Sequence, residues 1–245
     1  MRLALVSDIH GNLPALEAVV EDIRRRGADQ IVCLGDNVSG PLLPRETAQY
    51  LMSTGWTVLA GNHERQVLSF DSHGSGASDR YAYSQLTAPE IDWMRSLKPH
   101  VLLSPTIFLC HGTPSSDCEH FLETPRAGSL VVASSADIAC RLGHVGSELV
   151  ACGHSHVPRS VRMPTGQLLV NPGSVGLQAY TDDQPEFYAM ELGTPDAHYA
   201  IVERVSTGWL SAHYAVQYDH VSMAKLAKAR SRPDWESALL RGYAR

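Results

Sequence analysis

Aspartate and histidine residues stand directly after several short apolar segments of this chain. They are Asp8 and His10 after residues 3–6, Asp36 after 30–34, His111 after 106–110, and His154 and His156 after 149–152. Apolar runs of this length are typical of buried strands. A carboxylate at the end of such a strand is costly unless it is paired or bound to a metal, and carboxylate and imidazole groups are common metal ligands. We therefore expect the strand ends to converge on a metal centre in which Asp36 bridges two ions.

Each of these signals is weak when it is taken alone. Residues two apart in an extended chain point the same way, so Asp8 and His10 could reach one ion, but Asp8 could equally cap a helix. His154 and His156 share this spacing, and such a pair is more often a hydrogen-bonded surface feature. His111 alone would be interpreted as a buried histidine with satisfied hydrogen bonds. The combination of residues, and no single one of them, indicates a site.

The same residues belong to a set of motifs that occur in a fixed order. The motifs are Asp8-x-His10, Gly35-Asp36, Gly61-Asn62-His63-Glu64, His111-Gly112 and Gly153-His154-x-His156. This set resembles the D-x-H, G-D-x, G-N-H-[DE], H-G and G-H-x-H motifs of the calcineurin-like metallophosphoesterase superfamily. The later Asn171-Pro172-Gly173-Ser174 resembles an element of its small bacterial YfcE-like phosphodiesterase branch. The resemblance implies the fold and the activity of that superfamily.

The resemblance also implies a role for each motif residue. Asp8, His10, Asp36 and His156 would hold a first metal ion, and Asp36, Asn62, His111 and His154 would hold a second. His63 would bind no metal and would act as the general acid toward the leaving group of a phosphoester. Nitrogen and oxygen ligands without thiolate suit Mn, Fe, Zn, Co or Ni, so two divalent ions of this group are the expected cofactors.

The charges of the ligand set agree with a phosphate-containing substrate. Two dications would outweigh the negative charges of Asp8 and Asp36, so the site would attract an anion. Two ions about 3.5–4 Å apart suit in-line displacement at phosphorus, and a water between them would ionise near neutral pH and become the nucleophile. The expected function is therefore hydrolysis of phosphomonoesters or phosphodiesters.

The sequence is also compatible with other functions of proteins that share these motifs. The chain could be a non-catalytic metal-binding interaction module, as in the retromer subunit that resembles this superfamily, but His63 and all seven ligand positions are present. It could also hydrolyse nucleotides or dinucleoside polyphosphates, or act as a nuclease. The serine/threonine phosphatases of the superfamily carry an arginine shortly after the G-D motif. Residues 35–41 lack this arginine, which disfavours protein substrates.

Two further groups of residues are weaker candidates. Asn37 and Ser174 could contact the substrate, but an Asx turn at Asn37 and a tight turn at Ser174 are alternatives. Asp117, Glu119 and His120 could form an accessory site, for which a solvated loop is the favoured alternative.

The order of the expected elements predicts an α/β fold. Strands at 1–6, 30–34 and 57–60 alternate with helices, which gives parallel pairing. A hairpin at 101–110 follows. The last segments, at 159–163, 167–171, 186–192 and 197–205, have the turn spacing of an antiparallel meander. We expect two packed mixed β-sheets, a β-sandwich flanked by helices, in a single domain over residues 1–245.

Two segments between the motifs are expected to cap the site. Segment 70–97 predicts two helices, the second capped by Thr87 and Glu90, and segment 113–130 is polar and irregular. Because variable segments over a rigid scaffold usually select the substrate, we assign that role to both. Two helices over 221–243 close the chain and carry no residues of the site type.

Composition limits the partners and the compartment. The chain has 245 residues, a net charge of −6 and five cysteines without a Cys-x-x-Cys pair. The charge disfavours non-specific nucleic-acid binding, and the cysteines indicate a reducing compartment. No run reaches the roughly 18 apolar residues of a membrane helix. We expect a cytoplasmic protein whose partner is a small phosphorylated substrate, with a nucleotide among the alternatives, and neither a membrane nor nucleic acid.

Overall fold

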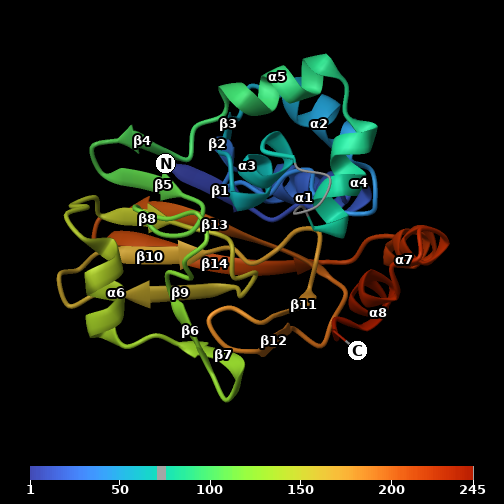
Figure 1. Ribbon diagram of the computed structural model, residues 1–245. Helices are drawn as coiled ribbons and strands as arrows, with labels where there is room; N and C mark the ends of the chain where they lie inside the picture. The colour runs from blue at the N-terminus through green and yellow to red at the C-terminus, as the bar shows by residue number, and fades with distance from the viewer. Residues whose placement is uncertain (71–75, 245) are drawn as a thin grey trace.

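Segments from both ends of the sequence build the first sheet of the computed structural model, which describes residues 1–70 and 76–244 (Figure 1). Its strands, in the order β14-β13-β1-β2-β3, are β14 (Gly208–Val216), β13 (Ala197–Val205), β1 (Arg2–Val6), β2 (Gln30–Cys33) and β3 (Thr57–Val58). The first three strands of the chain pair in parallel, as predicted, and β13 pairs antiparallel with β1. The turn-rich stretch at 71–76 of the sequence lies almost wholly outside the described residues.

The second sheet supplies the other half of the sandwich. Its strands, in the order β4-β5-β8-β10-β9, are β4 (His100–Ser104), β5 (Ile107–Cys110), β8 (Leu149–Ala151), β10 (Leu168–Asn171) and β9 (Arg159–Arg162). β4 and β5 form the predicted hairpin, and β5, β8 and β10 are parallel neighbours. The carboxyl ends of β5 and β8 therefore lie at one edge, where His111 and residues 153–156 follow them.

Apolar side chains from both sheets fill the space between them. Leu3, Leu5, Val32 and Leu34 of the first sheet and its loops pack with partners such as Leu109 and Ala151 of the second. Burial of this apolar surface, at about 25 cal/mol per Å², is the main force that holds the two sheets together. The expected sandwich of two mixed sheets is confirmed.

Helices cover the outer faces. They are α1 (Leu13–Arg26), α2 (Pro44–Met52), α3 (Asn62–Leu68), α4 (Ala77–Gln85), α5 (Ala88–Ser96), α6 (Ser135–Leu142), α7 (His220–Ala229) and α8 (Pro233–Arg241). Figure 1 shows α2, α4 and α5 grouped beside the first sheet, and α7 with α8 on the side where β11 lies. The sequence signals for helix ends hold: Asn12 caps α1, and the backbone N–H of Thr87 donates to Glu90 at the start of α5.

A third, small sheet differs from the expectation. Its strands, in the order β11-β12-β7-β6, are β11 (Ala179–Asp182), β12 (Tyr188–Glu191), β7 (Gly128–Val132) and β6 (Glu123–Arg126). The last third of the chain is therefore not one antiparallel meander, and segment 113–130 is not wholly irregular. Pro125 argues against a strand in the sequence, but β6 is an edge strand, where proline is tolerated. Among the described helices, none is long and apolar enough to cross a membrane.

Candidate metal centre

Six of the seven predicted metal ligands lie in loops that follow strands, and Asn62 begins α3. Five of the loop residues have a left-handed backbone. The φ angle is 55° at Asp8, 52° at His10, 55° at Asp36, 67° at His154 and 60° at His156. This conformation is uncommon for residues other than glycine and persists where surrounding contacts fix it. The expectation that each ligand pair is extended is therefore wrong, because the chain turns at each ligand.

Backbone hydrogen bonds between the loops hold this conformation. The N–H groups of Asp8 and His10 donate to the carbonyls of Gly35 and Asp36, each at 3.0 Å. The loops approach each other closely at Gly35, because a Cβ there would lie 2.6 Å from the backbone nitrogen of Gly61. The ligand loops thus support one another before any ion is considered.

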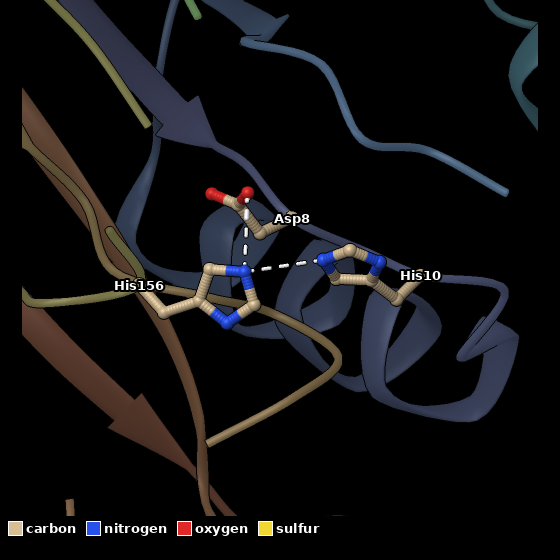
Figure 2. Close-up of side chains that lie close together, drawn as sticks. All are labelled: Asp8, His10 and His156. Atoms are coloured by element: carbon tan, nitrogen blue, oxygen red, sulfur yellow. Dashed lines mark hydrogen bonds and ion pairs between the residues drawn. The ribbon is translucent and has the colours of Figure 1, made fainter. Parts of the chain in front are cut away.

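Asp8, His10 and His156 form a first group that could hold an ion (Figure 2). The Nε2 atoms of His10 and His156 lie 3.1 Å apart, and Nε2 of His156 lies 3.3 Å from Oδ1 of Asp8. Figure 2 shows this nitrogen of His156 facing both neighbours. All three residues are buried, so their ligand atoms are shielded from bulk water.

Asp36, His111 and His154 form a second group. Nε2 of His111 lies 3.1 Å from Oδ2 of Asp36 and 3.1 Å from Oδ1 of Asn62. The same nitrogen lies 4.0 Å from Oδ1 of Asp8, which makes the two groups neighbours. The fold thus brings together side chains that are up to 148 positions apart, from Asp8 to His156.

Carbonyl groups determine which ring nitrogen each histidine offers. Because a carbonyl can only accept, the histidine nitrogen beside it must donate. Nδ1 donates in three pairs at 2.8 Å: His10 to Ser39, His111 to Leu34, and His156 to Leu177. His154 is reversed, with Nε2 donating to the carbonyl of Cys118 at 3.0 Å. The opposite nitrogen of each ring is left for a metal, and such outer partners orient metal-binding histidines.

The buried charges of Asp8, His10 and His154 fit divalent cations. At His111 burial would lower the pKa, but Asp36 raises it to about 10, so a metal there would displace a proton. Oδ1 of Asp8 is buried without a hydrogen-bond partner among the described residues, which is costly unless an ion compensates it. Burial alone would raise the pKa of Asp8, but His156 and His111 lower it to about 2. Burial lowers the pKa of His10 to about 4 and that of His154 to about 3. Near pH 7 these groups are a carboxylate and two neutral rings, which are the forms that bind metals.

The buried side chain of Glu64 connects the Asp36 loop with the Gly61 loop. Its carboxylate accepts backbone N–H groups from Gly61 at 2.7 Å, Asp36 at 2.9 Å and Asn37 at 2.8 Å. The side chain is fully buried. No water molecule is therefore at hand to accept hydrogen bonds from these N–H groups in place of Glu64. The motif contained Glu64, but its function as a common acceptor for two ligand loops emerges only from the fold.

His63 lies beside Asp36 and is held by a carboxylate that sequence reasoning missed. The backbone N–H of His63 donates to Oδ1 of Asp36 at 2.9 Å, and its Nδ1 donates to Oδ1 of Asp79 at 2.7 Å. Burial would lower the pKa of His63, but Asp36 and Asp79 raise it to about 9. Asp79 comes from α4, where no motif marks it, and it also accepts from Ser39 at 2.7 Å. The ring is thereby oriented with Nε2 as its remaining nitrogen.

The structure places two predicted substrate contacts away from the pocket wall. Asn37 and Ser174 are fully buried. Nδ2 of Asn37 donates to the carbonyl of Leu59 at 3.0 Å, and Oγ of Ser174 donates to the carbonyl of Asp8 at 2.8 Å. These bonds position the ends of strands and the Asp8 loop. By this geometry both residues hold the backbone that carries the ligands, and neither faces the pocket.

The three candidate accessory residues on segment 113–130 point to different places. Asp117 forms a forked pair with Arg65, at 2.8 and 2.9 Å, and Glu119 is exposed. His120 is buried, with its ring 4.9 Å from that of His154 and its Nε2 2.8 Å from the hydroxyl of Tyr188. The solvated-loop interpretation therefore fails for His120, which packs behind a predicted ligand.

A pocket of about 330 Å³ opens over the two ligand groups. Its floor includes His10, Asp36, Asn62, His63, His154 and His156, and its walls include Ser78, Tyr180, Asp182, Arg232, Asp234 and Trp235. Segment 70–97 contributes Ser78 to this lining, and segment 113–130 contributes none of it. The last helix, on which no residue of the metal-ligand type was expected, contributes Asp234 and Trp235 to the lining. The start of α8 bears no motif, and only the fold shows that it reaches the pocket.

A two-sheet sandwich with adjacent clusters of aspartate and histidine at one edge agrees with the metallophosphoesterase class that the motifs predicted. Residues 1–194 match the calcineurin-like phosphoesterase superfamily domain. The match covers most of the chain, so the protein belongs to this superfamily, as the motifs predicted. The class of activity that follows is hydrolysis of phosphoester bonds.

Individual relatives support the same placement. The chain is 28% identical over 188 residues to phosphodiesterase YfcE of Escherichia coli, covering 72% of this chain and 80% of that protein, which supports the expected YfcE-like branch. It is 26% identical over 193 residues to the uncharacterized protein MJ0912 of Methanocaldococcus jannaschii, covering 76% and 72%. A metallophosphoesterase structure from Sphaerobacter thermophilus superposes with a TM-score of 0.76 at 23% identity, covering 99% and 100%, and shows the same fold.

Proposed function

We propose that the protein is a phosphoesterase that uses two divalent ions, of the Mn, Fe, Zn, Co or Ni group, to hydrolyse phosphomonoesters or phosphodiesters. The observation that carries the proposal is the adjacency of the two ligand groups. Nε2 of His111 lies 3.1 Å from Asp36 and 4.0 Å from Asp8, so both groups share the floor of one pocket. Adjacent cation sites suit displacement at phosphorus.

Each residue of the floor has a task in this proposal. Asp8, His10, Asp36 and His156 would hold one ion, and Asp36, Asn62, His111 and His154 would hold the other. When bound, the ions would supply positive charge for phosphoryl oxygens and lower the pKa of a water that attacks phosphorus. The buried ligand loops would keep these groups in place without reorganisation, because hydrogen bonds already fix them.

His63 would act on the leaving group. Its Nδ1 donates to Asp79 at 2.7 Å, so the proton that reaches the departing oxygen would come from Nε2. The pocket wall beside His63 would keep bulk water from taking over as the proton donor to the leaving group. An interaction module would have no use for this oriented proton donor, which favours the enzyme over the non-catalytic alternative.

The first experiment compares the wild type with His63→Gln. Release of p-nitrophenol from p-nitrophenyl phosphate and from bis(p-nitrophenyl) phosphate is followed with Mn²⁺ added. We expect kcat to fall by about 10²–10⁴-fold, the usual contribution of a general acid. Metal content, measured by plasma emission spectroscopy, should remain that of the wild type because His63 is not a predicted ligand.

His144→Gln is the matched control. His144 is exposed and does not line the pocket, so its replacement should leave both rates unchanged. An unaltered rate in His63→Gln would disprove the role given to His63. A wild-type protein that hydrolyses neither ester with any of the five metals would disprove the proposed function.

A further inference from the structure

The two ends of the pocket differ in charge and in origin. The floor is lined by predicted metal ligands and by His63, and it would be net positive with ions bound. The outer end is formed by Tyr180 and Asp182 of β11 and by residues at the start of α8. α8 lies beyond residue 194, where the superfamily match ends. The outer end is therefore built partly by a segment that the superfamily domain does not include.

The one arginine among the described lining residues is already engaged. Nε and Nη2 of Arg232 form a fork with the Asp234 carboxylate, at 3.0 and 2.6 Å. Nη1 of Arg232 donates to Oγ of Ser78 at 2.9 Å. The charges of Arg232 and Asp234 offset each other, and the arginine joins α8 to α4 as a structural bridge.

Asp182 is left as the uncompensated charge of the outer end. No described lysine or arginine forms an ion pair with it, and its contacts are the backbone N–H of Gln184 at 3.0 Å and the hydroxyl of Tyr188 at 3.5 Å. Its side chain is exposed at the end of β11. A negative charge at the pocket mouth opposes a second anionic group on the substrate and attracts a cationic one.

Aromatic rings flank the passage between the two ends. The ring of Tyr180 lies 4.9 Å from that of His156, and the ring of Trp235 lies 6.1 Å from that of His10. Gly40 makes room for the indole, because a Cβ there would lie 2.7 Å from Cη2 of Trp235. Tyr180 stands two residues before Asp182 on β11, and Trp235 lines the same pocket with the guanidinium of Arg232 5.7 Å from its ring centroid. Aromatic rings that share a pocket with a carboxylate form the kind of surface that binds alkylammonium groups.

We propose that Tyr180, Asp182 and Trp235 recognise the ester group of the substrate and select one that carries a positive charge, such as an alkylammonium alcohol. The inference rests on the proposed function and specifies its substrate class. A phosphoester of this class places its phosphate over the positive floor and its cation at the negative mouth. The pocket volume of about 330 Å³ is near the lower limit of about 300 Å³ for small-molecule pockets, so it suits a compact ester group better than a dinucleoside polyphosphate.

A pair of isosteric esters isolates the effect of charge. p-Nitrophenyl phosphorylcholine and p-nitrophenyl 3,3-dimethylbutyl phosphate have the same leaving group and nearly the same shape, and only the first carries a cation. We expect the wild type to prefer the choline ester by about 10-fold in kcat/KM, which is within the range of a partly desolvated cation–π and charge contact. A ratio near one in the wild type would overturn the inference.

Asp182→Asn tests the residue while keeping its shape and its acceptor for Gln184. The preference for the choline ester should fall to about 2- to 3-fold in this variant, because only the aromatic contacts remain. Tyr180→Leu should reduce the preference by removing one ring. Asp183→Asn is the matched control, since Asp183 is the exposed neighbour outside the pocket lining, and it should keep the wild-type ratio. An unchanged ratio in Asp182→Asn would overturn the inference.

Binding gives a second readout that needs no turnover. Saturation-transfer NMR of the whole chain without added metal should detect choline in preference to 3,3-dimethylbutanol, and Asp182→Asn should reduce that preference to what the aromatic contacts supply. Equal signals from both probes would contradict the inference. Hydrolysis of uncharged-group esters distinguishes this inference from the proposed function. Activity on bis(p-nitrophenyl) phosphate without a preference for the choline ester refutes this inference alone, and inactivity on both that diester and p-nitrophenyl phosphate refutes the proposed function.

Discussion

The floor and the outer end of the pocket are held in place by different means. The floor is fixed through the backbone: the Asp8 and His10 loop bonds to the Asp36 loop, and Gly153 donates to the carbonyl of His111 at 2.7 Å. The outer end depends on side chains, such as the Arg232 fork and the indole of Trp235. A backbone network tolerates little change, whereas side chains on β11 and α8 can be replaced one at a time.

This difference suggests how the molecule divides its work. Chemistry that is common to a superfamily needs ligands in a constant arrangement, which buried and mutually bonded loops provide. Choice of substrate needs variation, and it falls to exposed segments placed over the constant scaffold. Replacements in the floor should therefore abolish activity on every substrate, while replacements at the outer end should change the ratio between substrates.

Asp36→Asn is the most direct way to break the floor. The substitution removes the charge of the proposed bridging carboxylate, which is buried beside His111 and bonded to the backbone of His63. We expect loss of at least one of the two ions and a fall in kcat/KM of more than about 10⁴-fold, beyond the loss of one proton donor. Metal content and p-nitrophenol release, measured on the same sample, check both effects.

Asp183→Asn serves as the control for loss of a carboxylate as such, and it should behave as the wild type. If Asp36→Asn retained two ions and a substantial rate, Asp36 would not be the shared ligand. The contrast between floor and outer end would then lose its basis, because the floor would tolerate a change at its centre.

Glu64→Gln sharpens the comparison because it changes the support of the floor and no ligand. The carboxylate accepts hydrogen bonds from three backbone N–H groups. The NH2 group of glutamine would face one of these N–H groups, so that two donors would meet without an acceptor. We expect the free energy of unfolding to fall by about 1–3 kcal/mol and metal affinity to fall by about 10–100-fold, as for other outer partners of ligands. Urea unfolding and metal titration measure the two.

An exposed helical glutamate provides the reference for Glu64. Glu17 lies on α1, and Glu17→Gln should change stability by no more than about 0.5 kcal/mol. If Glu64→Gln bound metal as tightly as this control, the backbone network would contribute nothing to the centre.

Much of the floor could be predicted from the sequence because its signals are local. Apolar strands followed by Asp8, Asp36 or His111 identify both the sheet edge and the ligands. The order of the motifs then adds a constraint that no single pair supplies. The parallel pairing of β1, β2 and β3 follows for the same reason, since alternating strand and helix patterns determine it.

The remaining features depend on contacts between distant segments. The left-handed conformation of Asp8 and His10 arises from bonds to the Gly35 and Asp36 carbonyls, which no local pattern reveals. The third sheet joins β7 to β12 across about 60 positions, and β6 contains a proline that argues against a strand. Trp235 reaches the pocket only because Gly40 leaves space for it. Each of these is a property of packing rather than of sequence periodicity.

Asp79 lies at the boundary between the two regions, and its replacement should affect the rate without loss of a metal ligand. It belongs to α4 of segment 70–97, yet its carboxylate accepts from Nδ1 of His63 at 2.7 Å. In Asp79→Asn the ring loses its charged partner, and we expect kcat to fall by about 10- to 100-fold with KM unchanged, less than complete removal of the proton donor. Asp92→Asn, an exposed change on α5 of the same segment, should leave kcat unaltered.

A double-mutant cycle distinguishes orientation of His63 from general support of the fold. If Asp79 acts only through the ring, Asp79→Asn should have no further effect in a His63→Gln background, because the two residues then form one unit. Losses that multiply would show that Asp79 contributes independently, for example through its bond from Ser39 at 2.7 Å. Because Ser39 also accepts from His10, that result would assign Asp79 to the support of the floor instead of to the proton donor.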